Sequence, residues 1–196
     1  MDLTTLSTTE LFSIIALVVV LIACIVAFAM FRKRRTEKLR TQFGGAEYDR
    51  AVEKGGSRRQ AENRLEERAQ RVDGFHIKPL AAADRARFLE SWRGVQSRFV
   101  DGPAGAVTEA DLLLGDVMSS RGYPVSNFEQ TAADLSVDHP LVLANYRKAH
   151  EIALRQTRGE ASTEELRQAM VHYRTLFEEL VNEPEQPLAK AASSAR

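Results

Sequence analysis

The chain has 196 residues, of which 44% are hydrophobic and 28% charged, and its 27 Lys and Arg residues balance its 27 Asp and Glu residues. A formal net charge of zero argues against a nucleic-acid-binding protein, which usually relies on overall positive charge. The 11 Gly and 6 Pro residues exclude a collagen-like or low-complexity chain. A single Cys excludes a small secreted domain built on disulfide bonds. The length allows one domain with additional segments.

Residues 11–31 contain no charged side chain. A helix of this length spans about 30 Å, which is the thickness of the hydrocarbon core of a bilayer. Because a backbone in lipid must satisfy its own hydrogen bonds, this stretch is predicted to form a single transmembrane helix. Residues 1–10 form a short segment before it.

The apolar stretch is followed directly by a basic cluster: Arg32, Lys33, Arg34 and Arg35. Asp2 and Glu10 are the only charged residues on its other side. Lys and Arg residues next to a membrane span mark the cytoplasmic side. The sequence therefore predicts a single-pass protein of the cell membrane, with its N-terminus outside and its C-terminal domain in the cytoplasm.

A cleaved signal peptide is the alternative interpretation, because Ala27, Phe28 and Ala29 resemble a cleavage site. However, the segment before the apolar stretch has no Lys or Arg, and the stretch is longer than a signal-peptide core. The basic cluster would also follow directly after the cut. These three features favour a membrane anchor.

Residues 32–72 are predicted to form a basic helical linker, with 13 basic and 7 acidic residues. Residues 73–196 have the opposite balance, with 14 basic and 18 acidic residues. Anionic lipids of the inner leaflet attract basic segments next to a span. Two interpretations stay open: a collar that binds anionic lipid, or a topology signal followed by a solvated helix.

Two glycine pairs, at residues 44–45 and 55–56, divide this linker into helices. Ser57 and Gln60 form a capping box that starts a helix running to about Val72. Its apolar stripe is narrow and consists of Ala61, Leu65, Ala69 and Val72. This helix is therefore predicted to pack weakly on the rest of the protein or to act as a stalk.

Residues 73–183 are predicted to form a compact domain of four to five helices, because apolar residues recur there at spacings of three and four. The helices are expected at about 80–100, 106–121, 127–135, 140–156 and 163–180, and the first presents Phe88, Trp92, Val95 and Phe99 on one face. No stretch alternates apolar and polar residues as a half-buried strand does. The predicted fold class is therefore all-α, with residues 184–196 forming a disordered tail.

No motif typical of a catalytic site or of a phosphate-binding loop occurs in the sequence. The single Cys, Cys24, lies inside the apolar stretch, so the remaining chain has no thiolate ligand or nucleophile. No enzymatic activity and no cofactor are therefore expected. The weak candidates for a metal site are Asp and His side chains: Asp134, Asp138, His139, His150 and His172.

Each of these candidates also has a structural interpretation. An Asp before a helix that starts with Pro, such as Asp138 before Pro140, is an ordinary helix cap. His150 and His172 lie on consecutive helices joined near Gly159, so an antiparallel hairpin would bring their imidazoles together for metal binding or a pH response. Both histidines also lie at the edge of an apolar stripe, where amphipathic residues are common.

Four stretches of the domain resemble a group of uncharacterised bacterial proteins, in which a similar helical domain often follows one membrane span. These stretches start at Ser91 (SWRGVQSRFVD), Arg121 (RGYP), Asp134 (DLSVDHP) and Leu166 (LRQAMVHYR). The resemblance covers most of residues 36–182. It implies a bacterial membrane protein, and it implies no activity, cofactor or site residue.

Two functional classes remain at this point. The favoured one is a non-enzymatic helical domain, tethered to the inner face of the membrane, that binds an unknown protein partner or assembles with itself. The alternative is a small-molecule or metal-binding domain, with weak hydrolase activity as its enzymatic form, that uses the Asp and His residues named above. The lipid bilayer is an expected partner in both, and nucleic acid in neither.

Overall fold

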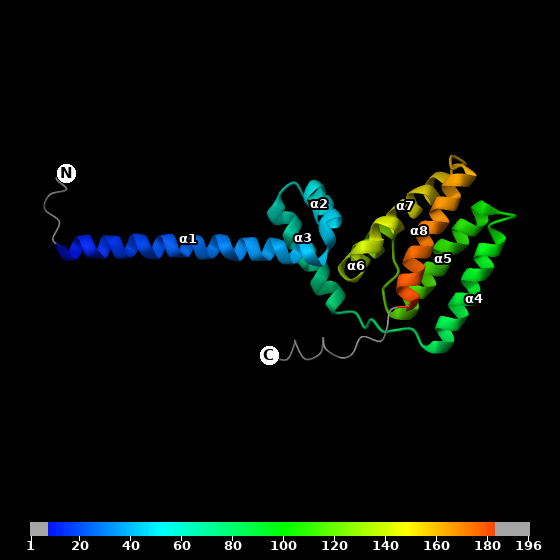
Figure 1. Cartoon of the computed structure of the whole chain (residues 1–196), viewed down its shortest axis with the longest axis horizontal. Coiled ribbons are helices and arrows are strands. Elements are labelled where there is room, and N and C mark those ends of the chain that lie inside the picture. The colour runs from blue at the N-terminus through cyan, green and yellow to red at the C-terminus, as the bar shows by residue number, and fades with distance from the viewer. Residues whose placement is uncertain (1–7, 183–196) are drawn as a thin grey trace.

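The computed structural model describes residues 8–182, and these residues form eight helices and no strand (Figure 1). The predicted all-α fold is therefore confirmed. The helices are α1 (Thr8–Gln42), α2 (Gly44–Gly55), α3 (Arg58–Asp73), α4 (Ala82–Arg98), α5 (Pro103–Arg121), α6 (Phe128–Asp138), α7 (Pro140–Gln156) and α8 (Thr163–Asn182). The tail predicted at 184–196 lies outside the described residues.

Helix α1 projects from the folded part of the protein as one long rod (Figure 1). It has 35 residues, which corresponds to about 50 Å at 1.5 Å per residue. It is long and apolar enough to span a membrane, and none of its most apolar window is buried by the described protein. The helix also continues without a break past Phe31 to Gln42, so the basic cluster belongs to the same rod.

Helices α2 and α3 form a hairpin that packs against the end of α1. Their small apolar core is almost fully buried and contains Leu39, Phe43, Tyr48 and Leu65. The glycine pairs separate the helices as predicted, and the Ser57 hydroxyl accepts a hydrogen bond from the Gln60 amide. The prediction that α3 packs weakly is wrong, because Ala61 and Leu65 are both 0% exposed. The stripe is narrow, but Ala61, Leu65 and Val72 are buried and Ala69 packs against the small core.

Polar contacts add to the apolar contacts in holding this hairpin on α1. The Arg35 guanidinium donates two hydrogen bonds to the Glu66 carboxylate, each with an N–O distance of 2.6 Å. The Thr36 hydroxyl donates to the buried Glu62 carboxylate at 2.7 Å, and the Tyr48 hydroxyl donates to the same oxygen at 2.9 Å. A bidentate arginine–carboxylate pair fixes geometry as well as energy. The hairpin is thus held in one orientation on the helix that precedes it.

Helices α4 to α8 enclose a second and larger core. Helix α7 packs along α8, α8 along α5, and α5 along α4, as Figure 1 shows. The rings of Trp92 and Phe177 stack in this core with centroids 4.6 Å apart, and both residues are at most 5% exposed. Ser162 and Glu165 form the predicted capping box at the start of α8, with reciprocal hydrogen bonds of 2.8 and 3.3 Å. The described residues thus contain two apolar cores: a small one among α1, α2 and α3, and a larger one enclosed by α4 to α8.

The extended segment between α3 and α4 is tied to the end of the bundle. The Lys78 amide donates to the Arg121 carbonyl at 2.9 Å, and the buried Arg121 guanidinium donates to the Leu180 carbonyl at 3.1 Å. Helix α5 ends at Gly122, whose φ of 95° is left-handed. A Cβ at this position would overlap the carbonyl oxygen of His76. Gly122 therefore permits both the helix end and the close approach of the segment.

We expect Gly122→Ala to lower the free energy of unfolding by at least about 2 kcal/mol, because it adds left-handed strain to a backbone clash. The measurement is urea unfolding of the full chain in detergent micelles, followed by circular dichroism. Gly105→Ala is the matched control in the same helix, since a Cβ there meets nothing within 4 Å. It should be neutral or stabilise by up to about 1 kcal/mol. Equal effects of the two changes would contradict this role of Gly122.

Candidate functional site

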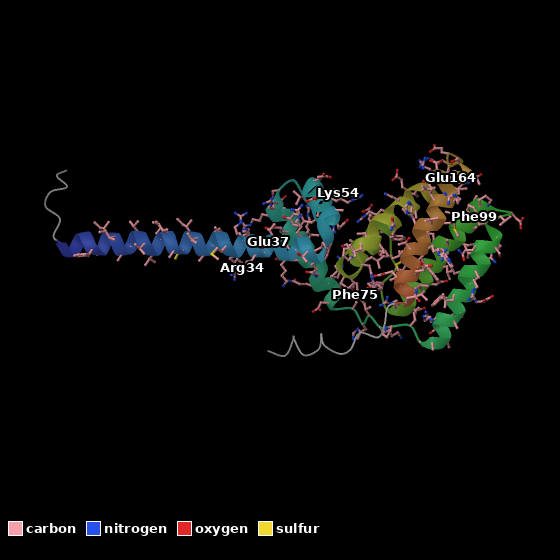
Figure 2. The ribbon with its side chains drawn as sticks, viewed as in Figure 1. Arg34, Glu37, Lys54, Phe75, Phe99 and Glu164 are labelled. Atoms are coloured by element: carbon pink, nitrogen blue, oxygen red, sulfur yellow. The ribbon has the colours of Figure 1, made fainter. Side chains whose placement is uncertain are left out.

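A charged cleft of about 430 Å³ lies where the α2–α3 hairpin meets α6 and α7. Six basic residues line it, against three acidic ones. The basic residues come from α2 (Arg50, Lys54), α3 (Arg64, Arg68, Arg71) and α7 (Arg147), and the acidic ones are Glu47, Glu67 and Glu129. Figure 2 shows Lys54 projecting from α2 on the side of the hairpin that faces the bundle. We refer to this site as the basic cleft.

Helical periodicity explains why these side chains gather on one side. Arg64, Arg68 and Arg71 follow one another at intervals of four and three residues, which places them on one face of α3. Arg50 and Lys54 are four residues apart on α2. The hairpin turns both faces toward the bundle. The walls of the cleft therefore result from two short sequence patterns and one turn.

A buried carboxylate holds the cleft together. Glu47 is only 7% exposed and accepts hydrogen bonds from Arg68 of α3 at 3.1 Å and from Arg147 of α7 at 3.2 Å. A buried charge is tolerated only when it is paired and hydrogen-bonded. Here one acid from α2 is paired with two bases from two other helices. Glu47 therefore links the hairpin to the bundle.

Asp134 makes the second link between the hairpin and the bundle. It lies on α6, is 2% exposed, and forms an ion pair with Arg71 of α3. The Gln130 side chain also donates to it at 3.0 Å. Asp134 is one of the metal ligands proposed from the sequence, but its carboxylate is occupied by these two donors. Its role in the structure is to attach α6 to α3.

Two arginines of the cleft remain available to a ligand. Arg50 and Arg64 are exposed, and neither makes an ion pair with another side chain in residues 8–182. The first turn of α6 also lines the cleft, and the Asn127 side chain caps it by accepting from the Gln130 amide at 2.9 Å. The start of a helix carries a partial positive charge. The cleft therefore suits a negatively charged group.

A second cleft, of about 600 Å³, adjoins the basic cleft and shares Arg50, Asn127, Glu129 and Arg147 with it. His150 lines it, and the imidazole stacks on the Phe128 ring with centroids 3.5 Å apart and planes inclined by 6°. Burial lowers the pKa of His150, and the nearby charges of Asp111 and Glu129 partly oppose that shift. His150 therefore packs against α6, and its burial favours the neutral form of the ring.

Asp138 and His139 lie together at a different place, the junction of α5, α6 and α7. The Tyr123 hydroxyl lies 3.0 Å from an Asp138 carboxylate oxygen and 3.2 Å from His139 Nε2. His139 is 3% exposed, and its Nδ1 lies 3.5 Å from the Glu179 carboxylate of α8. His139 also occupies the position before Pro140 that the sequence suggested, although its side chain does not cap α7. These contacts show that Asp138 and His139 form a polar junction between helices.

His172 lies on α8, near Lys148 of α7. Its pKa is lowered by burial and by the charge of Lys148 on α7. The antiparallel α7–α8 hairpin forms as expected, but His150 stacks on α6. Across residues 8–182, no three His, Cys, Asp or Glu side chains are placed to hold a metal ion together. The five metal candidates named from the sequence therefore do not come together as one site in this part of the chain: Asp138 and His139 share the Tyr123 hydroxyl, and Asp134 is bound by Arg71.

Sequence reasoning did not identify the basic cleft. The sequence did contain a signal for this cleft: Arg64, Arg68 and Arg71 are spaced to lie on one face of a helix whose apolar stripe is narrow. Such a pattern is common on solvated helices. It indicates a binding cleft only when basic residues of a second helix lie opposite it. Glu47 could not be distinguished from other acidic residues of the linker. Its burial depends on Arg147, which is 100 residues away in the sequence.

No family model matches this sequence, and no match was found among curated proteins or solved structures.

We expect Glu47→Gln to lower the free energy of unfolding by about 3 kcal/mol, because it leaves Arg68 and Arg147 facing each other with less negative charge. The measurement is urea unfolding of the full chain in micelles. Glu53→Gln, an exposed change on the same helix, is the matched control and should stay within about 0.5 kcal/mol of the unchanged chain. A Glu47 effect as small as the control would show that the link does not hold the hairpin on the bundle.

We expect the stability of the domain to decrease as the pH falls below 6.5, the ordinary pKa of His. The folded-state pKa of His150 is lowered, so the unfolded chain takes up a proton first, and stability is greatest where both states are neutral. His172 acts in the same direction. The His150→Gln, His172→Gln double variant should therefore show a flatter stability curve between about pH 7 and pH 5.

His76→Gln is the control for this pH experiment, because His76 is exposed and the change removes an imidazole without uncovering His150 or His172. It should keep the stability within about 0.5 kcal/mol of the unchanged chain and retain its slope. A double histidine variant with the original slope would mean that other groups cause the pH dependence.

Proposed function

We propose that this chain is a single-pass protein of the cell membrane, in which α1 is the anchor and the helical domain lies in the cytoplasm. The support for the anchor is the exposed apolar length of α1, on which side chains such as Phe12 and Leu17 are 71% exposed. A core helix of a water-soluble domain would be covered by its neighbours. The support for the orientation is the basic cluster on the domain side of α1.

We further propose that the domain is a non-enzymatic interaction module that binds a partner protein. The observation that carries this proposal is the basic cleft, in which Arg50 and Arg64, beside the start of α6, make no ion pair with a carboxylate of residues 8–182. The partner that fits is an acidic segment, because its carboxylates would complete the charge balance of the cleft. Assembly with a second copy of this chain is the competing outcome, because acidic residues of that copy could also bind Arg50 and Arg64.

The rigid connection between anchor and domain supports an organising role. Residues 32–42 continue α1, and the Arg35–Glu66 pair fixes α3 on that rod. Two walls of the cleft belong to α2 and α3, so the cleft is held close to the membrane surface. A flexible linker would only concentrate a partner near the bilayer. A rigid rod also gives the bound partner a defined direction.

The orientation has a direct test in a bacterial host. A periplasmic alkaline phosphatase reporter fused after Val181 should be inactive, because the enzyme stays in the cytoplasm. Strong activity of the fusion after Val181 would overturn the proposed orientation.

Partner binding is tested by photo-crosslinking in membranes. A photoreactive residue in place of Ala51, which lines the cleft, should give a crosslinked product. The product should be lost when Arg50→Gln and Arg64→Gln are combined, and its partner peptide should be acidic. Arg87→Gln with Arg93→Gln on α4 is the matched control and should leave the product intact.

Three results of this experiment separate the interpretations. A crosslinked acidic peptide of another protein supports the proposal. A crosslinked peptide of this chain identifies self-assembly instead. A product that is unchanged by the Arg50 and Arg64 substitutions shows that the cleft is not the docking surface.

A further inference from the structure

The start of α3 lies close to the part of α1 that leaves the apolar stretch. In Figure 1 it is the part of the folded domain nearest to the long apolar section of α1. The contacts agree, because Glu62 of α3 accepts from Thr36 and Asn63 accepts from Arg35 at 2.9 Å. Figure 2 labels Arg34 and Glu37 on this section of α1. After α2, the chain therefore comes back beside the basic cluster of α1, where α3 begins.

This position corresponds to the headgroup layer of a bilayer that α1 crosses. Phe31 to Thr36 is five residues, or about 7.5 Å of helix. The headgroup layer of one leaflet is about 5–8 Å thick. Side chains of a helix tilt toward its N-terminus, so the long side chains in the first turn of α3 extend toward the bilayer side. Arg58 and Arg59 occupy that first turn.

The charges at this level are mostly unpaired cations. Arg58 and Arg59 are exposed and have no ion-pair partner within residues 8–182, and the same holds for Arg32 and Arg34. Lys33 makes only a loose pair with Glu37, with both side chains largely exposed. Arg35 differs, because its guanidinium is bound to Glu66. The basic surface next to the membrane therefore differs from the cluster that the sequence suggests: it loses Arg35 and gains two residues of α3.

We propose that the first turn of α3 is a second lipid-binding element, in which Arg58 and Arg59 bind the phosphate groups of anionic phospholipids in the leaflet that α1 leaves. This proposal rests on the proposed membrane anchor. Arg32, Lys33 and Arg34 bind lipid around the α1 axis, whereas α3 binds to one side of it. Two attachment points on a rigid unit fix its tilt and rotation. The lipid contact therefore sets the direction in which the basic cleft faces.

The experiment uses the full chain in nanodiscs, with Cys24→Ser and a fluorophore on Gln60→Cys, an exposed position of α3. A quencher attached to lipid headgroups reports how close α3 lies to the surface. Quenching should be stronger in discs containing phosphatidylglycerol than in pure phosphatidylcholine. It should fall toward the phosphatidylcholine level at about 1 M salt, where the Debye length is about 3 Å.

The decisive variant combines Arg58→Gln with Arg59→Gln. It should lower the ratio of lipid-bound to released orientations by up to about 25-fold, at about fivefold for each arginine near the surface. The matched control, Arg87→Gln with Arg93→Gln, removes the same charge from α4 and should have no effect. Circular dichroism confirms that both variants are folded.

The outcomes distinguish this proposal from the membrane anchor. Equal quenching in both lipids, or equal effects of the two variants, overturns lipid binding by α3 and leaves the anchor intact. Extraction of the unchanged protein from membranes by alkaline carbonate would overturn the anchor, and the α3 proposal with it.

Discussion

The arrangement of this protein depends on carboxylates buried between arginines at the boundary of two apolar cores. Glu47 is paired with Arg68 and Arg147, and Asp134 is paired with Arg71. None of these three residue pairs belongs to an apolar core. The Glu47–Arg147 and Asp134–Arg71 pairs connect the five-helix bundle to the α2–α3 hairpin. Ion pairs of this kind contribute less to stability than apolar packing, but removal of one member is costly. The boundary is therefore specific in geometry and sensitive to the charge of a few residues.

The helices could be predicted from the sequence because each depends on neighbours within four residues. The capping box of Ser162 and Glu165, the stop at Gly122 and the aromatic stripe containing Trp92 are local signals of that kind. The packing of α3 was harder to predict from the sequence. Its stripe of small and medium side chains indicates a narrow contact, and only the position of α1, α2 and α6 shows that the whole contact is buried.

The candidate site was not predictable, for the same physical reason. A basic residue on a helix is solvated or functional according to what faces it, and that partner is set by tertiary structure. Arg147 faces Glu47 across 100 residues, and Arg71 faces Asp134 across 63. The predicted pair of His150 and His172 is a second example, in which the expected hairpin forms but a neighbouring helix provides another contact. The α7–α8 hairpin forms, but the His150 ring stacks on the Phe128 ring of α6, which packs beside α7.

The position of the hairpin connects the proposed lipid contact with the basic cleft. Helix α3 has Arg58 and Arg59 in its first turn and Arg64, Arg68 and Arg71 in the next turns. A rigid helix cannot turn its first residues toward lipid without also setting the direction of the others. The bundle supplies the opposite wall, through α6 and α7, and it is attached by charged pairs. The proposed acidic ligand would bind Arg50 and Arg64, whereas Glu47 and Asp134 use Arg68, Arg147 and Arg71 to attach the bundle. Ligand binding and attachment of the bundle therefore use different arginines of one cleft. We expect replacement of Arg50 and Arg64 to lower the affinity of the cleft and to leave the attachment of the bundle intact.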